Sequence, residues 1–317
     1  MPELPEVETV KRGLERLIVG RTIRVITHDT PKSFPNPPNE VDVFALGASV
    51  TAVRRRAKIL LIDLSSDYSF AIHLKMTGQL VFVAQKQTSD LRPKTEEGRQ
   101  QLSHLRSQVL DLPSDRFGAG HPNDSLVGEL PDRSTRVTFE FTDGTHLYFN
   151  DQRKFGWMKL VPTISVNEID FMKKLGPEPL EIDFTTTDFI SRIRRRNATT
   201  VKAAILDQTV LAGVGNIYAD ESLWGARIHP ATRVRDVSDE RLAVLLHEIK
   251  YVMNLAIEKG GSTDRNYVNA EGKRGSYTDF ARVFRREGQA CPRCGTTIEK
   301  TRVASRGTHI CPICQQI

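Results

Sequence analysis

Apolar residues recur at helical spacing directly after the amino terminus. Val7, Val10, Leu14, Leu17 and Ile18 form one stripe within residues 6–20. This period of about 3.6 residues is typical of an amphipathic helix. The Gly at position 20 follows the last apolar position and is a common helix end. We therefore predict an N-terminal helix that packs on a core.

The pattern then changes to short runs rich in β-branched residues. The eight runs lie at 22–28, 49–55, 58–64, 69–74, 79–84, 136–141, 145–149 and 156–161. The sequence FTDGT at 141–145 is a hairpin-turn signal. Many short strands separated by turns predict an antiparallel sandwich or barrel.

A polar stretch from about 85 to 133 interrupts these strands. Leu102, Leu105, Val109 and Leu112 fall at helical spacing, so the stretch has room for one helix. Its end, DRFGAGHPNDS, is rich in Gly, Pro, Asp and Asn. We interpret 85–133 as a surface insertion, because loops of this length are uncommon inside a compact domain.

The second half of the chain is helical in pattern. Residues 163–187 contain two prolines in LGPEPLEID and predict a linker. Helices are expected at 199–208 and 216–227, on either side of the glycine-rich turn TVLAGVG, and at about 238–259. A glycine-rich loop follows at 260–280.

All four cysteines lie near the carboxyl terminus, as two C-x2-C pairs. They are Cys291, Cys294, Cys311 and Cys314. Two such pairs at this spacing are typical of a four-thiolate zinc site. Two disulfides are the alternative, and an intracellular chain disfavours them. Four thiolates leave no open position, so the one predicted zinc ion is structural.

Composition narrows the class of protein. The chain has 317 residues, of which 39% are hydrophobic and 26% charged, as in soluble globular proteins. We find no apolar run of about 18 residues and no secretory signal, and we expect a cytosolic protein without a membrane span.

The net charge is +6 and is unevenly placed. Residues 188–317 carry 21 basic and 14 acidic side chains, an excess of +7, whereas residues 1–187 sum to −1. A basic C-terminal part suits a polyanionic partner, although solubility alone explains it equally well.

Several motifs, in order along the chain, resemble the formamidopyrimidine-DNA glycosylase family. They are MPELPEVETV at the start, RRAKILL at 55–61, HLKMTG at 73–78, DQRKFG at 151–156, LGPEPL at 175–180, GVGNIYADESL at 213–223 and the four-cysteine finger. The set spans nearly the whole chain. The insertion is the main part without a match.

The resemblance implies an α+β multidomain fold. An N-terminal antiparallel β-sandwich with the N-terminal helix would occupy 1–162, including the insertion at about 85–133. A linker at 163–187 would lead to a helix–two-turn–helix domain at 188–285 and a four-cysteine zinc finger at 286–317. Damaged double-stranded DNA would lie across the cleft between the domains, bound by a monomer.

The resemblance also implies a bifunctional glycosylase and abasic-site lyase that acts on oxidised purines. Removal of Met1 would free the nitrogen of Pro2 as the nucleophile. Glu3 would be the acid/base residue, with Glu6 supporting it one turn along. Lys58 would contact the phosphate at the lesion. Taken alone, Pro2 is an ordinary terminus and the two glutamates decorate a helix start.

Further residues would hold the DNA. Met76, Arg153 and Phe155 would fill the gap left by the extruded nucleotide, as apolar wedges and a base-pairing donor do. Lys202, Asn216 and Arg306 would contact phosphates. Taken singly, Met76 and Phe155 also fit a core position, and Asn216 also fits a simple helix N-cap.

The sequence departs from the family pattern at a few positions. Gln152 and Lys154 stand where the family often has Pro and Arg. Ser134 and Arg136 lie near the place of two common histidines, which leaves one phosphate contact unassigned. The lesion-capping loop corresponds roughly to 261–277, and its sequence does not reveal the accepted base.

Three other functions remain open. One is an oxidised-pyrimidine glycosylase of the endonuclease VIII type, although Leu4 favours the purine branch. A second is a non-catalytic DNA-binding homologue, which the intact Pro2, Glu3, Lys58 and Asn216 argue against. A third is a zinc-ribbon protein of transcription or translation, which leaves the N-terminal motif unexplained.

Overall fold

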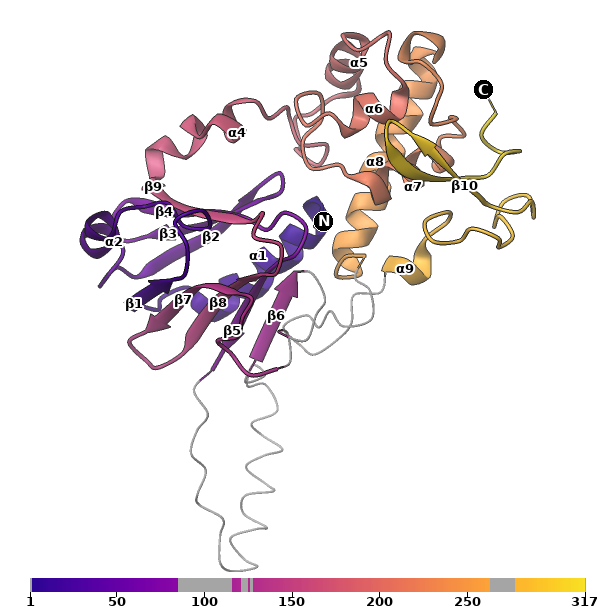
Figure 1. The fold of residues 1–317 in the computed structure, drawn as a ribbon. Coiled ribbons are helices and arrows are strands. Elements are labelled where there is room, and N and C mark those ends of the chain that lie inside the picture. The colour runs from indigo at the N-terminus through magenta and orange to yellow at the C-terminus, as the bar shows by residue number, and fades with distance from the viewer. Residues whose placement is uncertain (1, 85–115, 121–124, 126–127, 263–276, 317) are drawn as a thin grey trace, which may run out of the picture.

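The computed structural model describes residues 2–84, 116–120, 125, 128–262 and 277–316. They form two bodies joined by a connecting segment (Figure 1). Among the described helices, none combines the length and apolarity needed to span a bilayer.

The N-terminal body contains two antiparallel sheets. The first has the order β1-β7-β8-β5-β6, with β1 (Ile23–His28), β5 (Gly78–Val83), β6 (Arg116–Gly120), β7 (Thr135–Phe141) and β8 (His146–Asp151). The second has the order β2-β3-β4-β9, with β2 (Val50–Arg56), β3 (Ile59–Leu64), β4 (Tyr68–His73) and β9 (Trp157–Pro162). A short helix, α2 (Pro38–Phe44), precedes β2. The predicted antiparallel sandwich and its eight predicted strands are confirmed.

The two sheets share one apolar core. Phe70 of β4 meets Phe139 of β7 edge-on, with ring centroids 5.0 Å apart. The predicted helix, α1 (Leu4–Ile18), adds Val10 and Leu14 to this core. The Gly at position 13 lets the helix come close, because a Cβ there would lie 2.2 Å from the Phe117 ring.

The predicted insertion is shorter than expected. Residues 116–120 form strand β6, which pairs with β5 from Gln79↔Gly120 to Val83↔Arg116. Its glycines look like turn residues in the sequence, but Gly120 is needed for close strand pairing. With φ at +130°, a Cβ there would lie 2.3 Å from the Gly78 carbonyl oxygen. The helix expected around Leu102–Leu112 lies outside the described residues.

The C-terminal body is built from helices and one hairpin. Its elements are α5 (Thr186–Arg194), α6 (Val201–Leu206), α7 (Asn216–Gly225), η3 (Val234–Asp236), α8 (Asp239–Glu258), α9 (Tyr277–Phe280), β10 (Glu299–Val303) and β11 (Arg306–Ile310). The segment between the two bodies carries η2 (Thr163–Glu168) and α4 (Asp170–Lys173). The sequence prediction contains no helix at α5, whose N-cap Thr185 and first two residues lie in the predicted linker.

Helix α1 connects the two bodies. Its first residue, Leu4, is fully buried in the C-terminal core with residues such as Tyr218. The Leu4 N–H donates to the carbonyl of Gly213 at 3.1 Å. The amino terminus of the chain is therefore held where the two bodies meet.

Candidate active site

Glu3 lies at the start of α1, against the glycine-rich turn before α7. Its backbone N–H donates to Glu6 Oε2 at 2.8 Å, as in a capping box. Its own Oε1 accepts from the Ile217 N–H at 3.1 Å. Gly215 leaves the room for this contact, because a Cβ there would lie 2.1 Å from the Glu3 carboxyl carbon. Among the described residues, Glu3 Oε2 has no hydrogen-bond partner.

The Glu3 carboxyl is 4% exposed, and its surroundings set its protonation. Burial raises the pKa of Glu3 to about 7, against the attraction of Lys58, while the nearby Glu6 charge raises it further. The Ile217 N–H lowers this pKa, again without cancelling the burial. A carboxyl with a pKa near neutrality can both donate and accept a proton under working conditions.

Lys58 reaches the same place from the other side of the junction. Its Nζ donates to the Val214 carbonyl at 2.9 Å. Burial lowers the pKa of Lys58, Glu3 and Glu6 raise it, and the charge of Arg306 lowers it again. The site therefore combines groups from α1, from the start of β3 and from the α7 turn.

Glu6 links the active-site helix to the C-terminal body. Its Oε1 accepts from the Tyr218 hydroxyl at 2.5 Å, and from the Ser262 N–H at 2.8 Å and hydroxyl at 2.9 Å. The sequence prediction missed Tyr218 and Ser262. The predicted lesion-capping loop, 261–277, begins at this contact, and its residues 263–276 lie outside the described part of the chain.

Glu178 of the LGPEPL motif, also missed, holds the strand end that carries Lys58. Its Oε1 accepts from the Ala57 N–H at 2.5 Å, and its Oε2 accepts from Arg55 Nη1 at 2.7 Å. Glu178 follows Pro177, whose carbonyl accepts from the Ala212 N–H of the second body at 2.9 Å, so these bonds hold the strand end of Lys58 against that body.

Asn216 and Arg306 lie beside this centre. Asn216 opens α7, and its Nδ2 donates to the Gly307 carbonyl at 2.9 Å. Its buried Oδ1 has no hydrogen-bond partner within the described chain. Arg306 follows the β10–β11 turn and is exposed. The second Nδ2 hydrogen of Asn216 and the guanidinium of Arg306 are donors suited to a phosphate oxygen.

The ammonium of Lys202 has three N–H donors, and all three already have acceptors inside the protein, on Asp220, Gly307 and Thr308, which leaves none for a phosphate. The Lys202 side chain is 0% exposed, as is that of its ion-pair partner Asp220, with 2.6 Å between Nζ and Oδ1. The Nζ also donates to the Thr308 hydroxyl at 2.7 Å. A buried ammonium needs such partners. We therefore correct the prediction: Lys202 holds the β11 strand against α7.

Met76, Arg153 and Phe155 come together on the surface of the sandwich. Met76 lies between β4 and β5, and the other two lie between β8 and β9. Met76 is 44% and Phe155 48% exposed, which excludes the core interpretation. Arg153 Nη1 lies 3.3 Å from Met76 Sδ, and its guanidinium carbon lies 4.8 Å from the Phe155 ring centre.

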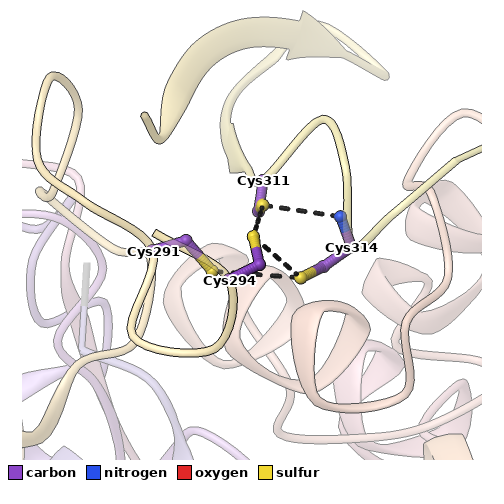
Figure 2. Close-up of side chains that lie close together, drawn as sticks. All are labelled: Cys291, Cys294, Cys311 and Cys314. Atoms are coloured by element: carbon purple, nitrogen blue, oxygen red, sulfur yellow. Dashed lines mark hydrogen bonds between the residues drawn. The ribbon is translucent and has the colours of Figure 1, made fainter. Parts of the chain in front are cut away.

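The four cysteine sulfurs form one cluster (Figure 2). All four lie within 4.8 Å of one another, and two pairs are 3.4 Å apart. A tetrahedral zinc ion with Zn–S bonds of about 2.3 Å needs sulfurs about 3.8 Å apart, so the cluster fits one zinc. Cys291 and Cys311 pack with Trp224 of α7 in a small core. The zinc finger is thus fastened to the helix that begins with Asn216.

Comparisons with known proteins agree with this arrangement. Family models of the formamidopyrimidine-DNA glycosylase N-terminal domain, its H2TH domain and the zinc finger found in FPG and IleRS match residues 1–158, 175–267 and 288–317. The formamidopyrimidine-DNA glycosylase of Latilactobacillus sakei is 37% identical over 99% of this chain and 98% of its own.

The chain belongs to the formamidopyrimidine-DNA glycosylase family. It is therefore a DNA glycosylase of DNA repair that acts on damaged DNA, with a structural zinc finger.

Solved structures of the family show the same fold. A Lactococcus lactis Fpg variant bound to DNA that contains Fapy-dG has a TM-score of 0.79 and 31% identity, with all of both chains covered. Lactococcus lactis Fpg bound to DNA with an abasic site also has a TM-score of 0.79 and 31% identity, with 99% of this chain and 100% of that chain covered. Both matches extend over the N-terminal sandwich, the H2TH domain and the finger of the glycosylase.

Proposed function

We propose that the enzyme excises oxidised purines, 8-oxoguanine and formamidopyrimidines, through an imine on Pro2 and then cleaves the strand by β,δ-elimination. The observation that carries this proposal is the state of Glu3. Its buried carboxyl, with a pKa of about 7, adjoins Pro2 and faces Lys58. A merely structural carboxylate at a helix start is stabilised in its charged form instead.

The proposed chemistry starts with removal of Met1, which frees the Pro2 nitrogen. This nitrogen attacks C1′ of the damaged nucleotide, the bond from C1′ to the base breaks, and the base leaves with that electron pair and takes up the proton that the Pro2 nitrogen loses. Glu3 gives its proton to the ring oxygen, so the sugar opens and a cationic iminium forms. Glu3 Oε2, which has no hydrogen-bond partner in the described part of the chain, is the oxygen available for this transfer.

The iminium makes the C2′ proton acidic. Loss of this proton breaks the 3′ C–O bond and releases the 3′ phosphate, and a second elimination breaks the 5′ C–O bond. Hydrolysis of the imine then frees Pro2 and the sugar remnant. Lys58, Asn216 and Arg306 would hold the phosphates during these steps.

The nucleotide must leave the duplex before Pro2 can reach C1′. Extrusion costs a few kcal/mol, and insertion of side chains into the gap offsets it. Exposed Met76 and Phe155 would wedge between bases, and Arg153 would bond to the orphaned partner base. We further expect the enzyme to act as a monomer in the cytosol.

Base release from defined duplexes tests the proposal. The probes carry 8-oxoguanine, a formamidopyrimidine or an oxidised pyrimidine opposite its normal partner. We expect release of the oxidised purines, with phosphates at both new strand ends. Release of the oxidised pyrimidine alone would instead indicate an oxidised-pyrimidine glycosylase of the endonuclease VIII type. Binding without release from any probe would leave a non-catalytic homologue.

A further inference from the structure

Asp151 is buried beneath the residues proposed to fill the DNA gap, and it joins their two loops. Its Oδ1 accepts from the Thr77 hydroxyl and, at 3.3 Å, from the Arg153 N–H. Its Oδ2 accepts from the Gly156 N–H at 2.6 Å. Thr77 follows Met76, and Gly156 follows Phe155. One carboxylate thus sets the spacing of both loops.

The backbone of Asp151 is held as firmly as its side chain. Its N–H donates to the Ser134 carbonyl at 2.8 Å. Its carbonyl accepts from Arg136 Nε at 3.0 Å. Ser134 and Arg136 are the residues near the place of the two common histidines, so this departure from the family pattern lies at the residue that joins the two gap-filling loops.

The guanidinium of Arg136 is buried and bonded to other groups of the protein. Arg136 is 5% exposed, its Nη1 pairs with the Asp29 carboxylate, and its Nη2 donates to the Arg133 carbonyl. The Asp29 N–H donates back to the Arg136 carbonyl at 3.0 Å. All three nitrogens of the guanidinium therefore have protein partners, which makes Arg136 a poor phosphate ligand.

We propose that Arg136, held by Asp29, is a positioning residue that fixes the main chain of Asp151 and so aims Arg153 and Phe155 at the gap in the DNA. This inference rests on the proposed function of those two side chains. The competing assignment is a direct phosphate contact by Arg136.

The two assignments predict opposite results for two variants, which are compared with a matched control. Arg136→Gln removes the guanidinium, and Asp29→Asn removes its anchor. Arg133→Gln is the matched control. It also removes one positive charge nearby, but it keeps the main-chain carbonyl of Arg133, to which Arg136 donates. Binding is measured against salt on a duplex with an abasic-site analogue and 2-aminopurine opposite it. Excision is measured on 8-oxoguanine opposite cytosine.

For a positioning residue, Arg136→Gln leaves the salt dependence of binding unchanged. It lowers single-turnover excision by roughly tenfold to a hundredfold, as displacements of about 1 Å do, and it lowers the change in 2-aminopurine fluorescence. Asp29→Asn acts in the same direction with a smaller effect. Arg136→Lys, which can still pair with Asp29, recovers part of the fluorescence change.

A phosphate contact predicts the reverse. The log–log salt slope would fall by about 0.9 with Arg136→Gln, the fluorescence change would stay, and Asp29→Asn would tighten binding by freeing the arginine. That result overturns the proposal. If Arg136→Gln does not fold, the exposed residue Asp29 provides the same test, because its substitution disturbs the core less. Wild-type enzyme that releases no 8-oxoguanine contradicts the proposed function instead, and the fluorescence and salt arms still decide the role of Arg136.

Discussion

The site proposed for chemistry and the site proposed for gap filling are built in opposite ways. Glu3 and Lys58 are about 5% exposed or less, and they meet at the junction of the two bodies. Met76 and Phe155 are nearly half exposed, and they stand on neighbouring loops of one sandwich. The first site depends on burial, and the second depends on exposure.

The difference follows from what each site has to do. A carboxyl needs burial for its pKa to approach 7, and two bodies closing over it provide that burial. Side chains that enter a base stack must instead be exposed. Packing therefore cannot position them, and the main chain that carries them has to be held in place. Lys75 precedes Met76, and Lys154 precedes Phe155. Both lysines have left-handed φ values, of 52° and 54°, and this backbone conformation keeps the two loops tight.

The largest expected effect is loss of chemistry when the buried carboxyl loses its proton. Glu3→Gln should lower single-turnover base excision by about a hundredfold to ten-thousandfold, while binding to an abasic-site analogue remains. The matched control is Glu15→Gln, on the exposed side of the same helix. Equal excision by both variants would contradict the role of Glu3.

The zinc finger should matter next, through binding rather than chemistry. Cys311→Ser removes a fully buried ligand, so we expect zinc content to fall from one ion per chain and DNA affinity to fall by at least about tenfold, because small metal sites fold with their metal. Metal analysis and binding titrations check this. Near-normal DNA binding by the zinc-free variant would contradict the prediction.

A substitution in the gap-filling site should slow base excision without changing the stability of the fold. Phe155→Ala should slow excision by about tenfold, since stacking on a base contributes roughly 1–3 kcal/mol. Its free energy of unfolding should change by less than about 0.5 kcal/mol. The matched control Phe70→Ala, in the core, should cost roughly 3–5 kcal/mol. Similar destabilisation by both changes would show that Phe155 is a packing residue.

The last expected effect concerns stability and not DNA repair: the free energy of unfolding should depend on pH. Glu3 has a folded pKa of about 7 against an ordinary value of 4.5. Between these values the folded chain keeps a proton that the unfolded chain has released, so stability falls as the pH rises. Glu3→Gln has no such proton to lose. Its free energy of unfolding relative to that of wild type should therefore rise by up to roughly 3 kcal/mol between about pH 4 and about pH 8. Denaturant titrations at both pH values test it, and a constant difference would mean that Glu3 is not perturbed.

Sequence patterns predicted the elements far better than the contacts between them. Period and β-branching were enough for α1 and the strands, because each reflects one buried face. Strand β6 was missed because its glycines, needed for close pairing, look like a turn.

At the site, motif order predicted Glu3 and Lys58, and the C-x2-C spacing predicted the four cysteines. The burial of Lys202 could not be predicted, because its ion-pair partner Asp220 belongs to a different helix. For the same reason, no local pattern in the sequence reveals that Arg136 reaches Asp29 and Asp151.

The central claim is that a nitrogen at the start of α1 forms a covalent imine with the sugar. Borohydride trapping on a duplex with 8-oxoguanine opposite cytosine tests this most directly, with the adduct mapped by peptide mass and the removal of Met1 checked in the same spectrum. We predict a reduced adduct on Pro2, formed by wild type and strongly diminished in Glu3→Gln. No adduct from Met1-processed protein, on this duplex or on one with an abasic site, would contradict the account.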